Sequence, residues 1–183
     1  MGICTRVREE LTHAQDAVSA MTASQTIDEL ECYWKEFLHA LERVWSKAQS
    51  SHKGNVHWDG WKGAYVTERK QNQMLAYLRH ARNAEEHTIA DITEKTPGSV
   101  TIQAGPTGSA VVRSFTVSRN GTVEFQGLGS IETTFSPGRV ELLDVVDRNG
   151  ATYPPPSGSI LDVARAGLHY YADFVDAMER RFS

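Results

Sequence analysis

The chain has 183 residues, of which 40% are hydrophobic and 23% charged, and its formal net charge is −4 at pH 7. This composition is typical of a globular protein long enough to bury a core without disulfides. The acidic balance excludes extended, non-specific coating of nucleic acid, although a local nucleic-acid site stays open.

The cysteines and the N-terminal residues predict a cytoplasmic protein. Cys4 and Cys32 both fall in predicted helices, and we expect two buried thiols in a reducing compartment. The N-terminus lacks the apolar run of a signal peptide, and no segment supplies the roughly 20 apolar residues that cross a membrane. We therefore expect no membrane partner.

Two amphipathic helices are predicted at the start of the chain. Apolar residues at steps of three and four predict the first over residues 4–22. Thr26 and Glu29 have the spacing of a capping box, which predicts the start of a second helix that continues to about Gln49. The apolar stripe of this second helix contains Ile27, Leu30, Trp34, Phe37, Leu38, Leu41, Val44 and Trp45.

A polar segment, residues 50–63, is predicted as a loop. It contains Trp58 and Trp61, which we expect to plug the end of a helical bundle, with stacking on nucleic-acid bases as the alternative. Helical spacing then predicts a third helix over residues 62–92, with or without a kink near Arg82.

Residues 99–153 are rich in Val, Thr, Ser, Phe and Gly, and they predict a small antiparallel sheet of four or five strands. Asn120-Gly121 favours the positive φ angles of a type I′ turn, so the strands on either side should form a hairpin. The last two strands are also expected to pair with each other. The predicted strands are 100–102, 110–117, 122–125, 131–135 and 140–146, followed by a turn at Asp147-Arg-Asn-Gly150.

A last helix follows, with Ser157 or Ser159 as its cap, and its apolar stripe needs a partner in the bundle. The predicted fold class is therefore α+β, as a single domain over the whole chain. It consists of an antiparallel bundle of three or four N-terminal helices plus the C-terminal helix, residues 1–96 and 157–183. The β-rich region at about 99–153 is inserted into this bundle.

The end of the third predicted helix gathers the groups best suited to chemistry. Cleavage of RNA without a metal needs a proton carrier and a cation on the phosphate, for which histidine and arginine are suited. Arg82 and His87 offer both, and Asn83 adds an amide that can orient either group. Arg79 and His80 are predicted to extend the substrate-binding surface.

Helix geometry sets a condition on this site. Asn83 and His87 are four residues apart and share a face of a straight helix, whereas Arg82 and His87 are five apart, about 140° around the axis. A helix that restarts near Arg82 would allow the three side chains to meet. A helix that continues to Ile92 would place them on different faces.

The segment Arg82-Asn83-Ala84-Glu85-Glu86-His87 resembles the Arg-Asn-x-x-x-His signature of HEPN-domain proteins. These are helical-bundle proteins, many of them ribonucleases of toxin–antitoxin, CRISPR-associated and anti-phage systems. The family keeps the arginine and histidine near the start of a late helix, and two units form a composite, metal-independent site. The resemblance implies that Arg82 clamps phosphate, Asn83 orients and His87 acts as general acid or base.

The resemblance covers the helices before residue 96 and the closing helix, and the β-rich insertion is not part of a minimal HEPN bundle. Our first hypothesis is accordingly a homodimeric endoribonuclease that acts on RNA. The alternative is a non-enzymatic module, in which the sheet or the edge formed by Trp58 and Trp61 binds a protein partner. Under the alternative, Arg82 and Glu86 are an ordinary ion pair on a helix surface.

Two histidines of the chain also have a spacing that is found in metal sites. Glu10 with His13, and Glu36 with His39, have the Glu-x-x-His spacing of di-iron bundles. Both pairs lie off the apolar stripes of their helices, so they should not point into a bundle core. No glycine-rich segment precedes a predicted helix as a phosphate-binding loop would. We therefore expect neither a metal nor a cofactor.

Overall fold

The computed structural model describes residues 3–87, 91–106, 108–117 and 123–182. It contains helices and small antiparallel sheets, which confirms the predicted α+β class. Contacts divide the chain into two units, which we call the helical unit and the β unit. The helical unit comprises residues 1–94 and 140–183, and the β unit comprises residues 95–139.

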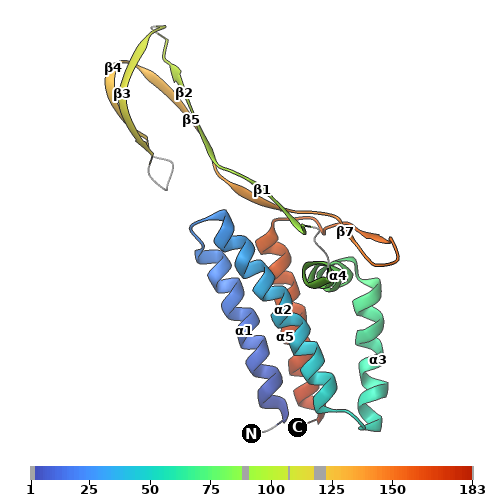
Figure 1. Ribbon diagram of the computed structural model, residues 1–183. Coiled ribbons are helices and arrows are strands. Elements are labelled where there is room, and N and C mark those ends of the chain that lie inside the picture. The colour runs from blue at the N-terminus through green and yellow to red at the C-terminus, as the bar shows by residue number, and fades with distance from the viewer. Residues whose placement is uncertain (1–2, 88–90, 107, 118–122, 183) are drawn as a thin grey trace. The chain divides into compact units, whose positions relative to one another are not determined.

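Five helices are present among the described residues, all in the helical unit. They are α1 (Ile3–Ala23), α2 (Ile27–Ser51), α3 (Val56–Gln71), α4 (Gln73–His87) and α5 (Ile160–Phe182). Helices α1, α2 and α5 lie side by side, and α4 runs across α2 and α5 (Figure 1). The predicted loop over residues 50–63 is wrong, because Trp58 and Trp61 lie in α3.

Side-chain caps explain where these helices begin. The capping box predicted at Thr26 and Glu29 is confirmed, since the Thr26 hydroxyl accepts the Glu29 N–H at 3.1 Å and the Glu29 carboxylate accepts the Thr26 N–H at 3.2 Å. Ser159, one of the two predicted caps, accepts the Asp162 N–H at the start of α5. Asn72 separates α3 from α4, because its side chain accepts the Leu75 N–H at 3.1 Å. The prediction of one helix over residues 62–92 is therefore wrong.

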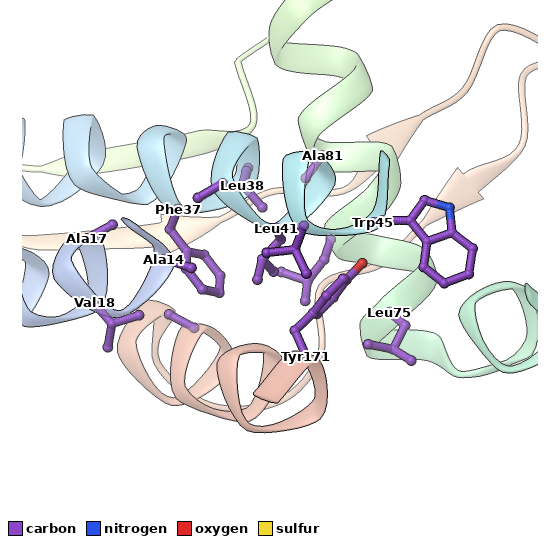
Figure 2. Close-up of a cluster of buried hydrophobic side chains, with 14 of the residues drawn as sticks. Ala14, Ala17, Val18, Phe37, Leu38, Leu41, Trp45, Leu75, Ala81 and Tyr171 are labelled. Carbon is purple, nitrogen blue, oxygen red and sulfur yellow. The ribbon is translucent and has the colours of Figure 1, made fainter. Parts of the chain in front are cut away.

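The core lies between α1, α2, α4 and α5, whose apolar side chains meet in one cluster (Figure 2). The apolar stripe predicted for α2 is confirmed in its central part, whereas Ile27 and Leu30 are only half-buried. Apolar burial of this kind is the main force that holds helices together. The largest fully buried side chains are Trp34, Trp58, Tyr77, Phe37 and Phe174.

Aromatic side chains pack together at one end of the bundle, as was predicted for Trp58 and Trp61. Trp58 is buried, and its ring packs on Trp61 with 5.2 Å between centroids and on Phe182 of α5 with 5.6 Å. His52 stacks on Trp58 at 4.7 Å. These contacts make Trp58 part of the core, so it cannot serve as an exposed docking or base-stacking edge.

We expect the stability of the helical unit to fall in mild acid because of His52. Burial lowers the pKa of its imidazole below the usual 6.5, and Nε2 has no hydrogen-bond partner among the described residues. The unfolded chain then binds the proton more readily, so the free energy of unfolding decreases as the pH falls through 6.5. Urea unfolding at about pH 7.5 and about pH 5.5 should show a larger loss for the wild type than for His52→Phe. Equal losses in both proteins would contradict this assignment.

Eight strands are described, and they form four two-stranded sheets among the described residues. The pairs are β1 (Thr93–Thr96) with β6 (Arg139–Leu142), β2 (Ser99–Ala104) with β5 (Ile131–Ser136), β3 (Ala110–Val117) with β4 (Val123–Gly129), and β7 (Val145–Val146) with β8 (Thr152–Tyr153). The predicted β3–β4 hairpin is confirmed, although its turn at Asn120-Gly121 lies outside the described residues. The predicted pairing of residues 131–135 with 140–146 is wrong, because β5 pairs with β2.

The predicted β-rich insertion is divided between the two units. Val140 and Val145 are buried in the helical core, so β7 and β8 belong with the helices, while β2 to β5 form the β unit. The assignment of the whole chain to one domain stays a prediction.

The expected burial of both cysteines is wrong for Cys32, which is exposed. Its position is two residues before the buried Trp34, and about 200° of helical rotation places it on the opposite face of α2. The side chain of Cys4 lies outside the described residues. Among the described helices, none combines the length and apolarity needed to span a bilayer.

Candidate functional site

The predicted site lies on α4, which is held firmly against the bundle. Its inner face is buried through Leu78, Ala81 and Ala84. It packs against α5 at Gly167, where a Cβ atom would lie only 2.7 Å from Cδ1 of Leu78. Glu85 also contacts α2, with 2.6 Å between its carboxylate and Nε2 of His39. These contacts fix which residues of α4 face outward.

The helix is continuous from Gln73 to its last residue, His87, and does not restart near Arg82. The resemblance to HEPN proteins implied that the arginine and histidine stand near the start of a helix, and that expectation is wrong for α4. The predicted continuation to Ile92 is not seen either, since Ile92 precedes β1 in non-helical backbone. Residues 88–90 and the His87 side chain lie outside the described residues.

Arg82 is engaged within its own helix. Its Nη1 lies 2.5 Å from the Glu86 carboxylate and donates to Oδ1 of Asn83 at 3.3 Å. The side chain is only 22% exposed. Its Nε is buried and has no hydrogen-bond partner among the described residues. The guanidinium is therefore neutralised by Glu86 rather than open toward a ligand.

Two other predicted residues, His80 and Asn83, line a common cavity. The cavity has a volume of about 340 Å³, at the small end of the range for ligand pockets, and lies between α4 and the turn that joins β7 to β8. Helix α4 contributes His80, Asn83 and Ala84, which are spaced three and four residues apart on one face. The turn contributes Val146, Asp147, Arg148 and Asn149.

The turn side of the cavity is held rigid by Asp147. Its Oδ1 accepts the backbone N–H groups of Asn149 at 2.9 Å and Ala151 at 3.0 Å, and its Oδ2 accepts the Tyr153 hydroxyl at 3.2 Å. The hydrogen bonds from Ala151 and Asn149 lower the pKa of the Asp147 carboxyl. The Tyr153 ring in turn stacks on His80, with 3.7 Å between centroids. The cavity is therefore preformed.

His80 is held in its neutral form. Nη2 of Arg79 lies 2.8 Å from Nε2 of His80, so Nε2 accepts this hydrogen bond and the ring proton belongs on Nδ1. Burial, followed by the charge of Arg79, lowers the pKa of the imidazole below its usual value. His80 is thus suited to form a wall of the cavity, and its Nε2 lone pair is not available to take a proton.

A second groove, of about 500 Å³, lies between α1 and α2 and includes both histidines of the Glu-x-x-His pairs. Its lining carries Asp16 and Glu36 beside Arg43, so its charge does not favour phosphate. Glu10, which binds Arg43 at 2.6 Å, is buried nearby. Burial raises the pKa of Glu10, but hydrogen bonds from Arg43 and Lys47 outweigh it and lower the pKa to about 2. Within the described residues, no three His, Cys, Asp or Glu side chains are grouped as metal ligands.

No family model, curated protein or solved structure matches this chain. A role for the cavity is therefore inferred from its geometry and from the motif on α4. Sequence reasoning named His80 and Asn83 but missed Arg148 and Asn149. The Asp147-Arg-Asn-Gly150 turn was visible in the sequence, but nothing in it indicated that the turn would meet α4.

Proposed function

We propose that the protein is a HEPN-like, metal-independent endoribonuclease that acts in the cytoplasm as a homodimer, in a toxin or phage-defence setting. The observation that carries this proposal is the cavity to which His80 and Asn83 contribute. Position 87 follows position 83 by four residues, and on a helix this spacing repeats the same face. Residue 87, the position of the motif's proton carrier, therefore belongs to the same face of α4 as residue 83.

The proposed reaction is transfer of the phosphodiester within RNA. The ribose 2′-hydroxyl gives up its proton, its oxygen bonds to phosphorus, and the 5′-oxygen leaves with a proton, so a 2′,3′-cyclic phosphate forms. His87 moves protons at one or both of these oxygens. Asn83 donates its amide N–H to a phosphate or ribose oxygen. A second copy of the chain supplies the same groups from the other side of the RNA.

The direct test is incubation of the purified protein with single-stranded and structured RNAs in EDTA, with products separated on a denaturing gel. Cleavage with cyclic phosphate ends is expected, together with a dimeric mass in solution. If diverse RNAs stay intact both with and without divalent metal, the enzyme proposal is wrong.

Replacement of Glu86 by glutamine should strengthen RNA binding. The change frees the Arg82 guanidinium from its 2.5 Å ion pair and removes a negative charge beside it. Because exposed ion pairs contribute up to about 1 kcal/mol, the affinity for RNA should rise about two- to fivefold. Fluorescence anisotropy with labelled RNA measures the change. Glu132→Gln, which removes an exposed carboxylate of the β unit, is the matched control and should leave the affinity unchanged.

A non-enzymatic module that binds a protein partner is the second candidate, and the β unit favours it. In the β2–β5 ladder, Val100 is paired with Phe135 and Ala104 with Ile131, so these side chains lie on one face. None of these residues belongs to the hydrophobic core cluster. Exposed apolar side chains in this unit include Val111, Val112, Phe115, Leu128 and Phe135. Large apolar side chains that stay exposed in the β unit are candidates for contact with a partner.

The two candidates are separated by one variant. Leu128→Ser removes a large apolar side chain that is 66% exposed and lies outside the helical unit. Under the first candidate, it leaves the rate of RNA cleavage unchanged. Under the second, neither protein cleaves RNA. Wild-type protein immobilised on a column then retains a protein partner, and the immobilised variant does not.

A further inference from the structure

We propose that Arg148, in the turn between β7 and β8, is the residue that binds the phosphate of a single-stranded RNA in the cavity beside Asn83. This inference rests on the proposed function, because it names the phosphate-binding cation and the form of RNA for the same site. It also moves the role of cation away from Arg82, to which the motif assigned it.

The guanidinium groups of Arg82 and Arg148 differ in whether they are available to a ligand. Arg82 does not line the cavity, and it is bound to Glu86 and Asn83. Arg148 lines the cavity, is exposed, and forms no hydrogen bond or ion pair with any residue that the structure describes. Arginine presents five N–H donors in a planar fork that matches the oxygens of a phosphate. Of these two arginines, Arg148 is therefore the one that is free to bind a phosphate.

Several acceptor groups in the lining of the cavity are already occupied by hydrogen bonds within the protein. Both oxygens of Asp147 already accept hydrogen bonds, from two backbone N–H groups and from the Tyr153 hydroxyl. The Asn83 oxygen accepts from Arg82, which leaves the Asn83 amide N–H groups as donors. The guanidinium of Arg148 and the amide N–H groups of Asn83 are therefore donors that the cavity presents to a ligand. A ligand rich in acceptor oxygens satisfies them, and a phosphodiester is such a ligand.

The size and lining of the cavity suit a single nucleotide. Ala84 and Val146 give it an apolar part next to its polar groups, and a volume of about 340 Å³ accepts a small ligand rather than a helix. Specific RNA sites usually take unpaired bases, which can leave the stack and enter a pocket. A nucleotide from a single strand can place its base against Val146 and its phosphate on Arg148, whereas a base in a duplex stays stacked.

The experiment compares Arg148→Ala and Arg148→Lys with the wild type, using a 5′-labelled 12-nucleotide single-stranded RNA and a duplex of the same sequence. Arg180→Ala, at the exposed end of α5, is the matched control for the loss of one positive charge. We expect Arg148→Ala to weaken binding to the single strand about tenfold, as loss of a charged hydrogen bond does, with Arg148→Lys intermediate. The slope of log affinity against log salt should decrease by about 0.7, the value for one phosphate of a single strand.

The outcomes separate this inference from the proposed function. If the wild type cleaves RNA but Arg148→Ala binds the single strand as Arg180→Ala does, the inference is wrong and the function stands. If the wild type does not cleave, yet Arg148→Ala alone weakens binding to the single strand, the inference stands and the enzyme proposal falls. Preference for the duplex, or no binding of RNA by the wild type, overturns the inference.

Discussion

Replacing Trp34 with alanine should lower the free energy of unfolding by about 3–5 kcal/mol, the usual range for a large aromatic residue deleted from a core. Trp34 is fully buried in α2, and its ring stacks on Phe37 with 5.7 Å between centroids. The deletion removes the transfer free energy of the indole and leaves a cavity that the packed helices can only partly fill. Urea unfolding followed by circular dichroism at 222 nm measures the loss, since this signal reports the helical unit.

A second variant, Trp34→Phe, tests the effect of a smaller loss of volume at the same position. The indole N–H of Trp34 has no hydrogen-bond partner among the described residues, so the phenylalanine variant loses volume but no hydrogen bond. It should cost about 1–2 kcal/mol, well below the alanine variant. Val56→Ala, at a side chain that is 83% exposed, is the control and should stay within about 0.5 kcal/mol of the wild type. A loss below about 1 kcal/mol for Trp34→Ala would show that this core is not packed as described.

The second large effect concerns the proposed reaction. Removing the imidazole with His87→Ala should slow RNA cleavage by at least 100-fold, because general acid–base catalysis by a positioned histidine contributes about 10²- to 10⁴-fold. Single-turnover cleavage with enzyme in excess measures the chemical step, and the affinity for RNA should change little. Because His87 is the last residue of α4, the fold should tolerate the change.

His169→Ala is the matched control for this experiment. Its side chain is 82% exposed on α5, and its Nε2 lies 3.5 Å from the Asp173 carboxylate. Cleavage by this variant should equal that of the wild type, and circular dichroism and molecular mass should be unchanged in both variants. A His87→Ala protein that cleaves as fast as His169→Ala would remove His87 from the mechanism.

Apolar periodicity did not predict the start of α3 or the burial of Arg69. Residues 56–61 at the start of α3 were not predicted as helix because Trp58 is the only buried residue among them, so they show no apolar stripe. Arg69 is buried by stacking on Trp45, 4.2 Å from the ring centroid, and by a 2.8 Å hydrogen bond to Glu42. Apolar periodicity counts arginine as an exposed residue, so it did not predict that Arg69 is buried.

The pairing of one strand, residues 131–136, was also predicted wrongly. Residues 131–136 were expected to pair with the strand that follows them, but they pair with 99–104, which precedes them by about 30 residues. The observed partner, residues 99–104, and the expected partner, residues 140–146, both contain alternating apolar and polar residues. Alternation identifies which face of a strand is apolar, but it does not identify the neighbouring strand. By contrast, the β3–β4 hairpin was predictable because a short turn determines its own pairing.

The sequence by itself determined the local features of this protein. The helix caps at Thr26 and Ser159, the apolar stripe of α2 and the residue types on α4 all follow from contacts within a few positions along the chain. Only the tertiary structure decided which of these groups share a site. Arg82 is bound to Glu86, while Arg148, 66 positions later, lines the cavity of Asn83. The reason is that long-range placement depends on how buried faces pack together, and local hydrogen bonds and periodicity carry no information about that packing.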